Sequence, residues 1–312
     1  MDVSIIIVNW NTADLLRDCL KSVYECAGAV EYEIIVVDNA SADSSAEMIK
    51  NKFKNVILIE NTGNRGFAAA NNQGMAVATG RYVLLLNSDT IVLENSIANT
   101  VSFADENPEV AVTGCQVLNP DGTVQRTCFK FPSILNMLLS STYLYKLFPR
   151  NRFFGREQMT WWDRSDVREV DVVTGCFMLV RREAIEQVGM MDERFFMYGE
   201  ETDWCYRFRK RGWKIMFAPV GRIIHLGGQS TAKKPVAMII QLRLSILKFI
   251  KKHYGRSSYL LARFLVALFF AVRLPAWLAM AFLRPAARSE AAIKIRAYST
   301  GVVDALFGQV GP

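Results

Sequence analysis

Short runs of apolar residues, many of them β-branched, recur through the first 90 residues and end at polar side chains. Residues 3–8 form the first run, and residues 34–37, 56–59 and 82–86 form three more. Apolar runs of this length are typical of parallel strands that are covered on both faces. We therefore predict four buried strands in this part of the chain.

Helical periodicity separates these runs. Leu16, Leu20 and Val23 share one side of a predicted helix over residues 12–24. Strands and helices that alternate at this spacing indicate βαβ units, and hence an α/β fold with a Rossmann-like, mostly parallel sheet. Ligands of such sheets bind beyond the carboxyl ends of the strands, so the four strand ends should lie on one rim. Further helices are predicted over residues 41–53, 66–79 and 96–105.

The pattern between residues 115 and 235 is less regular. The sequence Asn-Pro-Asp-Gly at residues 119–122 is a strong turn signal and predicts a hairpin. The other elements expected here are an apolar helix over 133–148, a loop with exposed aromatic residues at 161–163, an interrupted strand over 170–180, a helix over 201–211, strands over 214–218 and 222–225, and a domain end at Gly227 and Gly228.

The last part of the chain is both apolar and basic. Residues 236–255 predict an amphipathic helix, and residues 257–283 are strongly apolar but include Arg263 and Arg273. Both uncharged runs, 264–272 and 274–283, are shorter than the roughly 20 residues that a spanning helix needs. We expect a helix in the plane of the lipid headgroups with its cations outward. A soluble helical pack or oligomer interface, and a true span or re-entrant hairpin, are the alternatives.

Composition and charge sharpen this division. The chain has 312 residues, 51% hydrophobic and 21% charged, which excludes a disordered, collagen-like or disulfide-stapled protein. Its formal net charge of +7 is unevenly spread. Residues 1–235 hold 26 Lys and Arg against 28 Asp and Glu, whereas residues 236–312 hold 11 against 2. We expect a slightly acidic domain over 1–235 and a basic helical tail over 236–312 that associates with membranes.

Cysteine usage and the N-terminus bear on the compartment. The six cysteines form no CxxC pair, and no histidine is spaced near them as a zinc ligand, so buried reduced thiols in a cytosolic protein are expected. Asp2 stands where a signal peptide would have a basic region, and the apolar run that follows is short. We therefore expect the first domain to face the cytoplasm.

Two predicted strand ends carry a carboxylate. Asp89 follows the fourth apolar run, where a carboxylate can hold a divalent cation that binds a diphosphate. Asp38 ends the second strand and can accept a hydrogen bond from a base or a ribose hydroxyl. Each has a plain alternative, because Asp also starts turns and caps helices.

A glycine-containing loop precedes the helix predicted from residue 66. Gly63 and Gly66 permit a tight turn, and a helix that begins at Gly66 directs N–H groups at an anion. Asn71 and Asn72 are poor helix formers, so another reason for their presence is needed. The spacing matches neither GxGxxG nor a P-loop, and a structural helix-start loop remains the alternative.

Two further groups are candidates for chemistry. Glu200, Glu201 and Asp203 suggest a general base whose pKa is shifted by burial and by neighbouring acids, although acids also suit a first helical turn. His225 ends a predicted strand and is one of only two histidines. A neutral imidazole there can ligate a metal, and a structural role is the alternative.

Together, these segments resemble family 2 glycosyltransferases of the GT-A fold, and more narrowly the bacterial rhamnosyltransferase-like members that build cell-surface polysaccharide. The resemblance covers residues 3–231, with its motifs in the family's order. They are SIIIVNWNTADLL, EIIVVDNASAD, NTGNRGFAAANNQG, YVLLLNSDT, DVVTGCFMLVRR, MDERFFMYGEETDWCYR and IIHLGGQS.

The resemblance implies roles for individual residues. Asn87 and Asp89 stand at the family's DxD-like motif, with Asn in the first position, so Mg²⁺ or Mn²⁺ would rest mainly on Asp89, donor phosphates, water and His225. Glu201 is the implied catalytic base, beside Glu200 in the acidic pair. The implied donor-binding residues are Asn9, Asn11, Asp38, Asn39, Gly66, Phe67, Asn71, Asn87 and Asp89. The expected acceptor contacts are Trp161, Trp162, Thr174 and Asp203.

The implied reaction is a single displacement with inversion at the anomeric carbon. The expected donor is a nucleotide sugar, dTDP-L-rhamnose in the first place, and the expected acceptor is a lipid-linked saccharide at the cytoplasmic face of the inner membrane. We expect an anionic membrane surface as a partner and no nucleic acid. A sugar-nucleotidyltransferase would need a basic, Gly-rich loop where this chain has Asn-Trp-Asn-Thr. A non-catalytic membrane or nucleic-acid binder is the third class.

Overall fold

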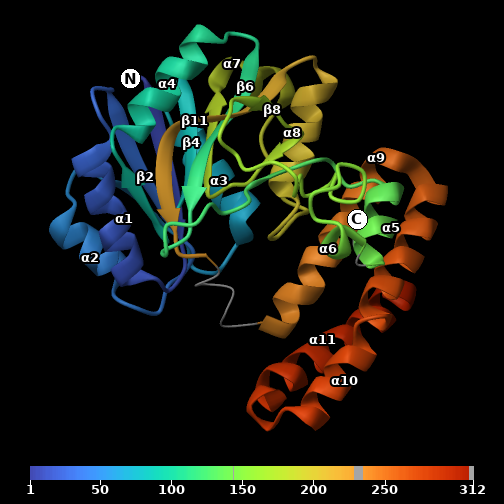
Figure 1. Cartoon of the computed structure of the whole chain (residues 1–312). Helices are drawn as coiled ribbons and strands as arrows, with labels where there is room; N and C mark the ends of the chain where they lie inside the picture. The colour runs from blue at the N-terminus through green and yellow to red at the C-terminus, as the bar shows by residue number, and fades with distance from the viewer. Residues whose placement is uncertain (143, 228–234, 309–312) are drawn as a thin grey trace. The chain divides into compact units, whose positions relative to one another are not determined.

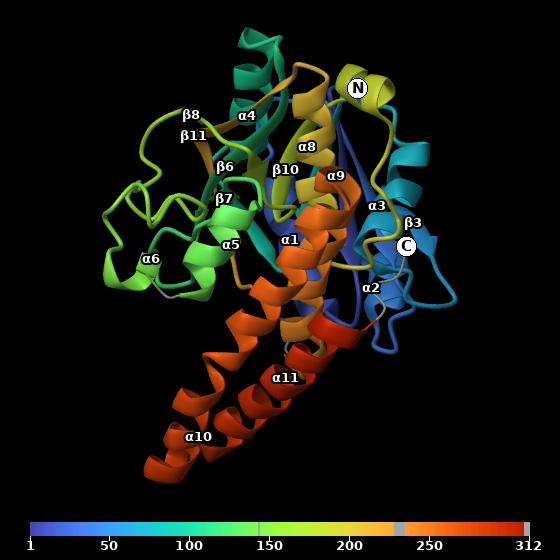
Figure 2. The same ribbon diagram turned by 90° about the vertical axis from the view of Figure 1, so that its right-hand side faces the viewer.

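The computed structural model describes residues 1–142, 144–227 and 235–308, so the expected domain end at Gly228 lies outside the described residues (Figures 1 and 2). Its contacts divide the chain into two units. Unit 1 comprises Met1–Lys130, Trp162–Phe196 and Glu200–Ser230, and unit 2 comprises Phe131–Trp161, Met197–Gly199 and Thr231–Pro312. This division differs from the expected boundary at residue 235, because residues 131–161 group with the tail.

A nine-stranded sheet forms the centre of unit 1, in the order β3-β2-β1-β4-β10-β6-β11-β5, with β8 paired to β11. The four predicted strands form its parallel half, which confirms the α/β fold. They are β1 (Val3–Asn9), β2 (Tyr32–Asp38), β3 (Ile57–Glu60) and β4 (Tyr82–Asn87). The others are β5 (Thr90–Leu93), β6 (Val110–Leu118), β8 (Arg168–Glu169), β10 (Phe177–Arg181) and β11 (Lys214–His225); β7 (Cys128–Phe129) and β9 (Val172–Val173) form a separate pair.

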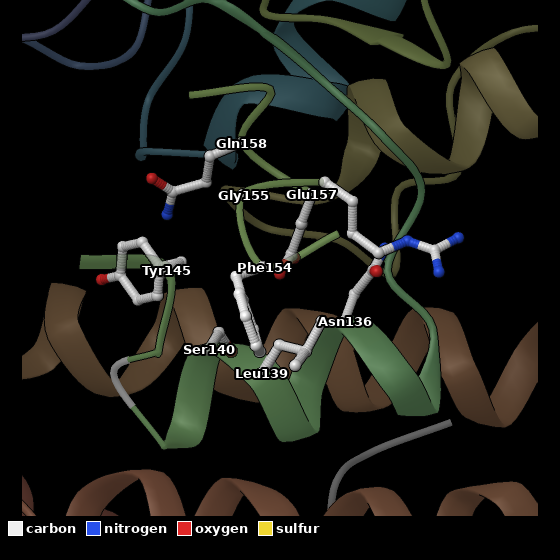
Figure 3. Close-up of a pocket in the computed structure, with 9 residues that line it drawn as sticks. Asn136, Leu139, Ser140, Tyr145, Phe154, Gly155, Glu157 and Gln158 are labelled. Atoms are coloured by element: carbon white, nitrogen blue, oxygen red, sulfur yellow. The ribbon is translucent and has the colours of Figure 1, made fainter. Parts of the chain in front are cut away.

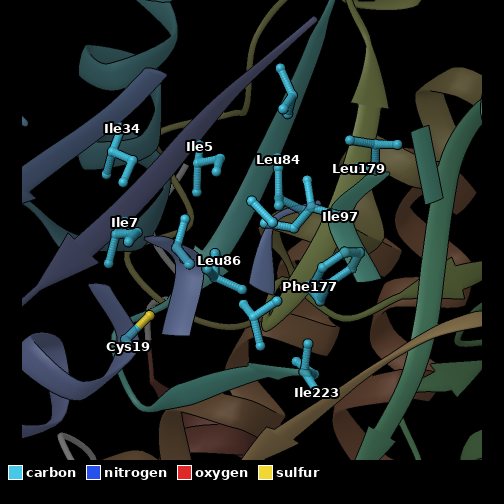
Figure 4. Close-up of a cluster of buried hydrophobic side chains, with 14 of the residues drawn as sticks. Ile5, Ile7, Cys19, Ile34, Leu84, Leu86, Ile97, Phe177, Leu179 and Ile223 are labelled. Carbon is cyan, nitrogen blue, oxygen red and sulfur yellow. The ribbon is translucent and has the colours of Figure 1, made fainter. Parts of the chain in front are cut away.

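Buried aliphatic side chains of these strands form the core of unit 1 (Figure 4). Ile5, Ile7 and Leu84 are fully buried because β1 and β4 lie inside the sheet with both faces covered. Leu16 and Leu20, on the predicted apolar side of α1, pack into the same cluster. The helices of unit 1 are α1 (Ala13–Cys26), α2 (Ser45–Lys52), α3 (Gly66–Val77), α4 (Ser96–Glu106), α7 (Arg182–Val188) and α8 (Glu200–Lys210).

The six thiols are free, and all but Cys26 are buried. Burial raises the pKa of Cys19 and of Cys128 to about 12, so few thiolate groups form at neutral pH. We expect at most one thiol, that of Cys26, to react quickly with a thiol reagent in the folded protein. The other five should react only after denaturation, which a titration with and without urea measures. Rapid modification of two or more thiols would contradict the buried arrangement.

Unit 2 consists of helices. They are α5 (Ile134–Ser141), α6 (Leu144–Leu147), α9 (Pro235–Ala271), α10 (Leu274–Leu283), the 3₁₀ helix η2 (Pro285–Ala287) and α11 (Arg288–Phe307). The single helix expected over 133–148 is thus two, α5 and α6. α5 packs on α9, where the Ser141 hydroxyl donates to the Leu265 carbonyl oxygen (3.0 Å) and the Phe131 and Phe249 rings stack. These contacts explain why residues 131–161 group with the tail.

Arg263 and Arg273 do not face the lipid headgroups in the way that the tail's pattern predicted. Arg273 is only 3% exposed, and its guanidinium donates to the carbonyl oxygen of Ser140 (2.9 Å) at the end of α5. Arg263 donates to that of Ala305 (2.7 Å) near the end of α11. The last carbonyls of a helix lack intrahelical partners and carry partial negative charge. Both cations therefore stabilise unit 2 internally.

The stretch Pro235–Leu283 contains a window that is apolar and long enough to cross a membrane, judged by length and composition alone. In the structure this stretch is divided. α9 is kinked at Gly255 (φ 84°), and α10 begins after a break at Val272 and Arg273. α10 has no buried residue, and Phe282 and Leu283 are 81% and 73% exposed.

Candidate active site

The carboxyl ends of the parallel strands meet at one edge of the sheet. Asn9 at the end of β1 pairs with Asp38 at the end of β2, and Val8 pairs with Asn87 at the end of β4. The predicted rim of strand ends is therefore present in the structure. The last residues of these strands and the turns after them carry six of the nine candidate donor-binding residues.

Asp38 and Asn9 form a buried hydrogen-bonded pair on this rim. The Asn9 amide donates to Asp38 Oδ1 (2.9 Å), and the Ser41 hydroxyl donates to the same oxygen (2.6 Å). Asn11 extends the network, since its Oδ1 accepts from the Ala42 backbone N–H (2.6 Å). Ser41 was not predicted as a site residue, because a serine in a turn gives no distinctive signal. The network fixes the β1 and β2 turns against each other and holds the Asp38 carboxylate in one orientation.

The start of α3 is held against the segment that leads to α8. Gly66 has φ +83°, and a Cβ there would lie 2.3 Å from the Phe196 carbonyl oxygen. The Phe67 N–H donates to that oxygen (2.8 Å), and the Asn39 amide donates to the Gly66 carbonyl oxygen (3.1 Å). Glycine is thus required here for both backbone conformation and space.

The two asparagines of α3 have structural partners. Asn71 is 1% exposed, and its amide donates to the Phe67 carbonyl oxygen (2.9 Å). Asn72 donates to the Met191 carbonyl oxygen and to Glu193, both at 2.9 Å. The Asn71 amide thus has a structural partner within α3, and its donor-binding role stays a prediction. These contacts explain why α3 contains Asn71 and Asn72, although asparagine is a poor helix former.

We expect Gly66→Ala to destabilise unit 1 by about 1–3 kcal/mol, because alanine is strained at positive φ and its Cβ would displace the Phe196 carbonyl. Thermal unfolding of the full chain measures this loss. Gly63→Ala is the matched control, since a Cβ at Gly63 meets nothing within 4 Å. Equal stability of the two variants would contradict the predicted clash.

Asp89 and His225 come together where β5 pairs with the end of β11. His225 is the register partner of Thr90, and its Nε2 lies 3.3 Å from both Asp89 Oδ1 and Asn87 Nδ2. Both side chains are largely buried, at 14% and 11% exposed. The predicted pairing of Asp89 with His225 is thus present in the geometry.

These donors fit a divalent cation. Ligands that are neighbours in an octahedron around Mg²⁺ are about 3 Å apart, close to the 3.3 Å between Asp89 Oδ1 and His225 Nε2. A carboxylate and an imidazole both suit Mn²⁺. Within the described residues no group of three or more His, Cys, Asp or Glu is arranged to hold a metal. Further ligands would therefore have to be donor phosphates and water.

The segment of residues 174–176 lies against the same rim. The Asn87 N–H donates to the Cys176 carbonyl oxygen (3.2 Å), and a Cβ at Gly175 would lie 2.9 Å from the Phe67 ring. Thr174 contacts the Cys176 thiol through its hydroxyl (3.2 Å). A candidate acceptor contact, Thr174, thus stands near the candidate donor residues Phe67 and Asn87.

Glu200 and Glu201 open α8, which packs against β9, the strand just before Thr174. Glu200 is 3% exposed, and Glu201 is half-buried. Glu201 is therefore the more exposed residue of this acidic pair, although the Oε2 atom of each carboxylate is buried. Tyr198 (φ 66°) and Gly199 (φ 88°) both adopt left-handed backbone conformations just before the helix.

Two of the expected acceptor contacts are buried in the structure. Asp203 is fully buried and pairs with Arg207 (2.9 Å), one turn along α8. Trp162, expected in an exposed loop, is 5% exposed, packs edge-on against Phe217 and donates to Asp166. Trp161 is half-buried, and the Arg152 guanidinium lies over its ring.

Comparison with known proteins agrees with this geometry. The profile described as "Glycosyl transferase family 2" matches residues 4–189. The chain belongs to glycosyl transferase family 2. Its GT-A fold and its activity as a glycosyltransferase follow from that membership and from the similar solved structures.

Two relatives and one structure illustrate the similarity. An N-acetylglucosaminyl-diphospho-decaprenol L-rhamnosyltransferase of Mycobacterium tuberculosis is 28% identical over 71% of this chain and 76% of its own. The Haloferax volcanii low-salt glycan biosynthesis hexosyltransferase Agl10 is 27% identical over 72% and 67%. The mannosyltransferase PcManGT of Pyrobaculum calidifontis, solved with GDP-Man and Mn²⁺, is 17% identical with a TM-score of 0.59, over 98% of this chain and 87% of its own.

Proposed function

We propose that this glycosyltransferase moves a sugar, L-rhamnose from dTDP-rhamnose in the first place, from a nucleotide sugar to a lipid-linked saccharide with inversion. The main support is the shared rim, on which Asp38 and Asn9 form one polar cluster and Asp89 and His225 form another. The first cluster suits a nucleoside, and the second suits a diphosphate held through a cation. The similarity to the mycobacterial rhamnosyltransferase supports the choice of sugar and of acceptor class.

In this proposal each residue has a defined task. Asp38 accepts hydrogen bonds from the nucleoside. Asp89 and His225 would hold Mg²⁺ or Mn²⁺, which when bound stabilises the charge of the departing nucleoside diphosphate. Glu201 removes the proton from the acceptor hydroxyl. The hydroxyl oxygen then attacks the anomeric carbon from the face opposite the diphosphate.

The proposed place of action is the cytoplasmic surface of the plasma membrane. Unit 2 holds 17 Lys and Arg against 3 Asp and Glu, a net charge of +14, whereas unit 1 holds 20 against 27, a net charge of −7. Exposed apolar residues such as Phe282 and Phe264 (59%) accompany these cations. Cations next to exposed aromatic side chains favour an anionic lipid surface. Such a surface would keep unit 1 near a lipid-borne acceptor.

A donor panel tests the proposal directly. Purified protein is incubated with Mn²⁺, a GlcNAc-diphospho-lipid acceptor and each of several dTDP-, UDP- and GDP-linked sugars. We expect acceptor-dependent release of dTDP from dTDP-rhamnose and an extended lipid product by mass spectrometry. A preference for another donor would contradict the choice of L-rhamnose but support the transfer of a sugar to this acceptor. Absence of transfer from every donor to this acceptor would overturn the acceptor class.

A further inference from the structure

The His225 side chain is held from behind by Gln125. The imidazole Nδ1 lies 2.6 Å from Gln125 Oε1. Gln125 follows the hairpin predicted at residues 119–122, and this hairpin is present: Gly122 N–H donates to the Asn119 carbonyl oxygen (2.9 Å). The predicted turn therefore brings Gln125 beside the end of β11.

Gln125 also has a defined amide orientation. Its Nε2 donates to Asn119 Oδ1 (2.8 Å) and to the backbone oxygen of His225 (3.3 Å), so the carbonyl oxygen Oε1 is the atom that faces Nδ1. An amide oxygen only accepts hydrogen bonds. The proton between the two side chains must therefore be on His225 Nδ1.

We propose that Gln125 is a positioning residue, which selects the His225 tautomer that has a lone pair on Nε2. In the neutral imidazole a proton on Nδ1 leaves Nε2 as an acceptor. Nε2 faces Asp89 Oδ1 and Asn87 Nδ2. An acceptor nitrogen beside a carboxylate oxygen is the arrangement that a divalent cation needs, and partners behind a ligating histidine commonly set its tautomer. This inference rests on the proposed metal-dependent reaction.

The tautomer can be observed without any metal or substrate. The chain has only two histidines, so ¹⁵N-histidine spectra contain few signals, and the His225→Asn spectrum assigns them. We expect one neutral imidazole with protonated Nδ1 and unprotonated Nε2. Gln125→Leu should lose this preference, whereas Gln125→Glu, which still accepts, should keep it. A neutral ring protonated at Nε2 in the parent protein would overturn the inference.

Binding of Mn²⁺ in the presence of a nucleoside diphosphate gives a second measurement, by the EPR signal of the free ion. Gln125→Leu should weaken binding about 10- to 100-fold, and Gln125→Glu should restore it. Gln187→Leu, at an exposed glutamine of α7, is the matched control. Unchanged affinity in Gln125→Leu would overturn the positioning role. If the parent protein bound no Mn²⁺ at all, the metal part of the proposed function would fail instead.

A separate observation concerns the loop after α6 in unit 2. Residues 146–156, Lys-Leu-Phe-Pro-Arg-Asn-Arg-Phe-Phe-Gly-Arg, hold four cations and no acid. Three large apolar side chains of this basic aromatic loop are exposed: Leu147 (69%), Phe148 (51%) and Phe153 (52%). Among the described residues, no ion pair involves Arg150, Arg152 or Arg156. In unit 1, by contrast, exposed arginines such as Arg81 and Arg194 have acidic partners.

The basic aromatic loop has a braced conformation. Asn151 Oδ1 accepts from the backbone N–H groups of Phe153 (2.8 Å) and Phe154 (3.1 Å). The Phe154 ring points inward to α5 beside a small pocket, close to Leu139 and Ser140 (Figure 3). Phe148 and Phe153 pack on it, with ring centroids 5.2 and 5.4 Å away. One phenylalanine thus anchors the loop while the other two stay exposed.

We infer that the basic aromatic loop is a second membrane contact of unit 2, which inserts Phe148 and Phe153 into an anionic phospholipid surface. Its charge is complementary to such lipids, and its aromatic side chains suit the headgroup boundary. In Figure 2, α6 with this loop and the exposed helix α10 lie toward the same side of unit 2. The chain would then contact the membrane at two places about 130 residues apart in sequence.

Site-specific fluorescence tests this second contact. An environment-sensitive fluorophore is attached to Phe153→Cys, Phe282→Cys or Ile57→Cys in a full-length Cys26→Ser background. With phosphatidylglycerol vesicles we expect a blue shift at 153 and 282 and none at 57, an exposed site of unit 1. A shift at 282 without one at 153 would overturn this inference alone. No shift at either site would also refute the membrane proposal, while transfer activity is assayed separately.

Affinity for vesicles gives an independent measurement. The double variant Phe148→Ser/Phe153→Ser should bind phosphatidylglycerol vesicles at least about tenfold more weakly, and Arg150→Gln/Arg156→Gln should weaken binding in low salt. Ile57→Ser and Arg211→Gln, at exposed sites of unit 1, are the matched controls. Circular dichroism verifies that each variant folds. Parent-like binding by both loop variants would exclude a lipid contact and leave a protein partner as the alternative.

Discussion

Replacing Glu201 by glutamine is expected to lower kcat for sugar transfer by about 10²–10⁴-fold and to leave donor affinity within a few-fold of the parent. Glutamine keeps the shape and the hydrogen-bonding capacity of the side chain but cannot take the proton of an acceptor hydroxyl. Glu201 lies in the first turn of α8 and is the more exposed residue of the acidic pair. Transfer to the lipid-linked acceptor and calorimetric binding of the nucleotide sugar measure the two quantities.

Glu200→Gln is the matched control for this experiment. Glu200 is adjacent in sequence and carries the same group, but it is only 3% exposed. We expect it to affect stability more than the chemical step. If Glu200→Gln abolished transfer while Glu201→Gln retained it, the base would be Glu200. Near-parental turnover in both variants would remove the acidic pair from the mechanism.

The parallel half of the sheet was predictable from sequence because its pattern is local. β1, β2 and β4 lie inside the sheet, and burial on both faces turns each strand into an apolar run that ends at the rim. The antiparallel half gave weaker signals. β10 enters between β4 and β6, and this order depends on pairings between residues 66 to 99 positions apart in the sequence.

Several residues are more buried than their position in the sequence indicated. Trp162 was chosen for its chemistry, but its burial depends on Phe217, which packs on it from 55 residues away. Arg273 looked like a surface cation until α5, more than 130 residues earlier, supplied its carbonyl partners. Gln125 was missed for the same reason, since His225 is 100 residues away. A sequence pattern reports local periodicity and leaves such distant partners unspecified.

Asp89→Asn is expected to reduce transfer at least about a hundredfold and to weaken Mn²⁺ binding in the presence of nucleoside diphosphate. The substitution keeps the side chain's size but removes its negative charge. A cation bound there would stabilise the negative charge on the leaving diphosphate by several kcal/mol. We expect a stronger dependence on Asp89 than in a site with two carboxylates, because Asn87 supplies an uncharged amide. His225 Nε2, 3.3 Å from Asp89 Oδ1, is neutral when it ligates and does not replace the lost charge.

Two further variants make this result interpretable. Asp14→Asn, on α1, removes an exposed carboxylate and should change neither Mn²⁺ binding nor turnover. Asn87→Asp adds a second carboxylate next to Asp89 and should tighten Mn²⁺ binding, because the cation would then be held by two negative charges. Parent-like Mn²⁺ affinity and turnover in Asp89→Asn would place the cation elsewhere. The pairing of β5 with β11 brings Asp89 and His225 together, so a substitution at Asp89 could also disturb the local structure. Unchanged thermal stability of the three variants would show that Asp89→Asn loses Mn²⁺ binding and transfer through its charge.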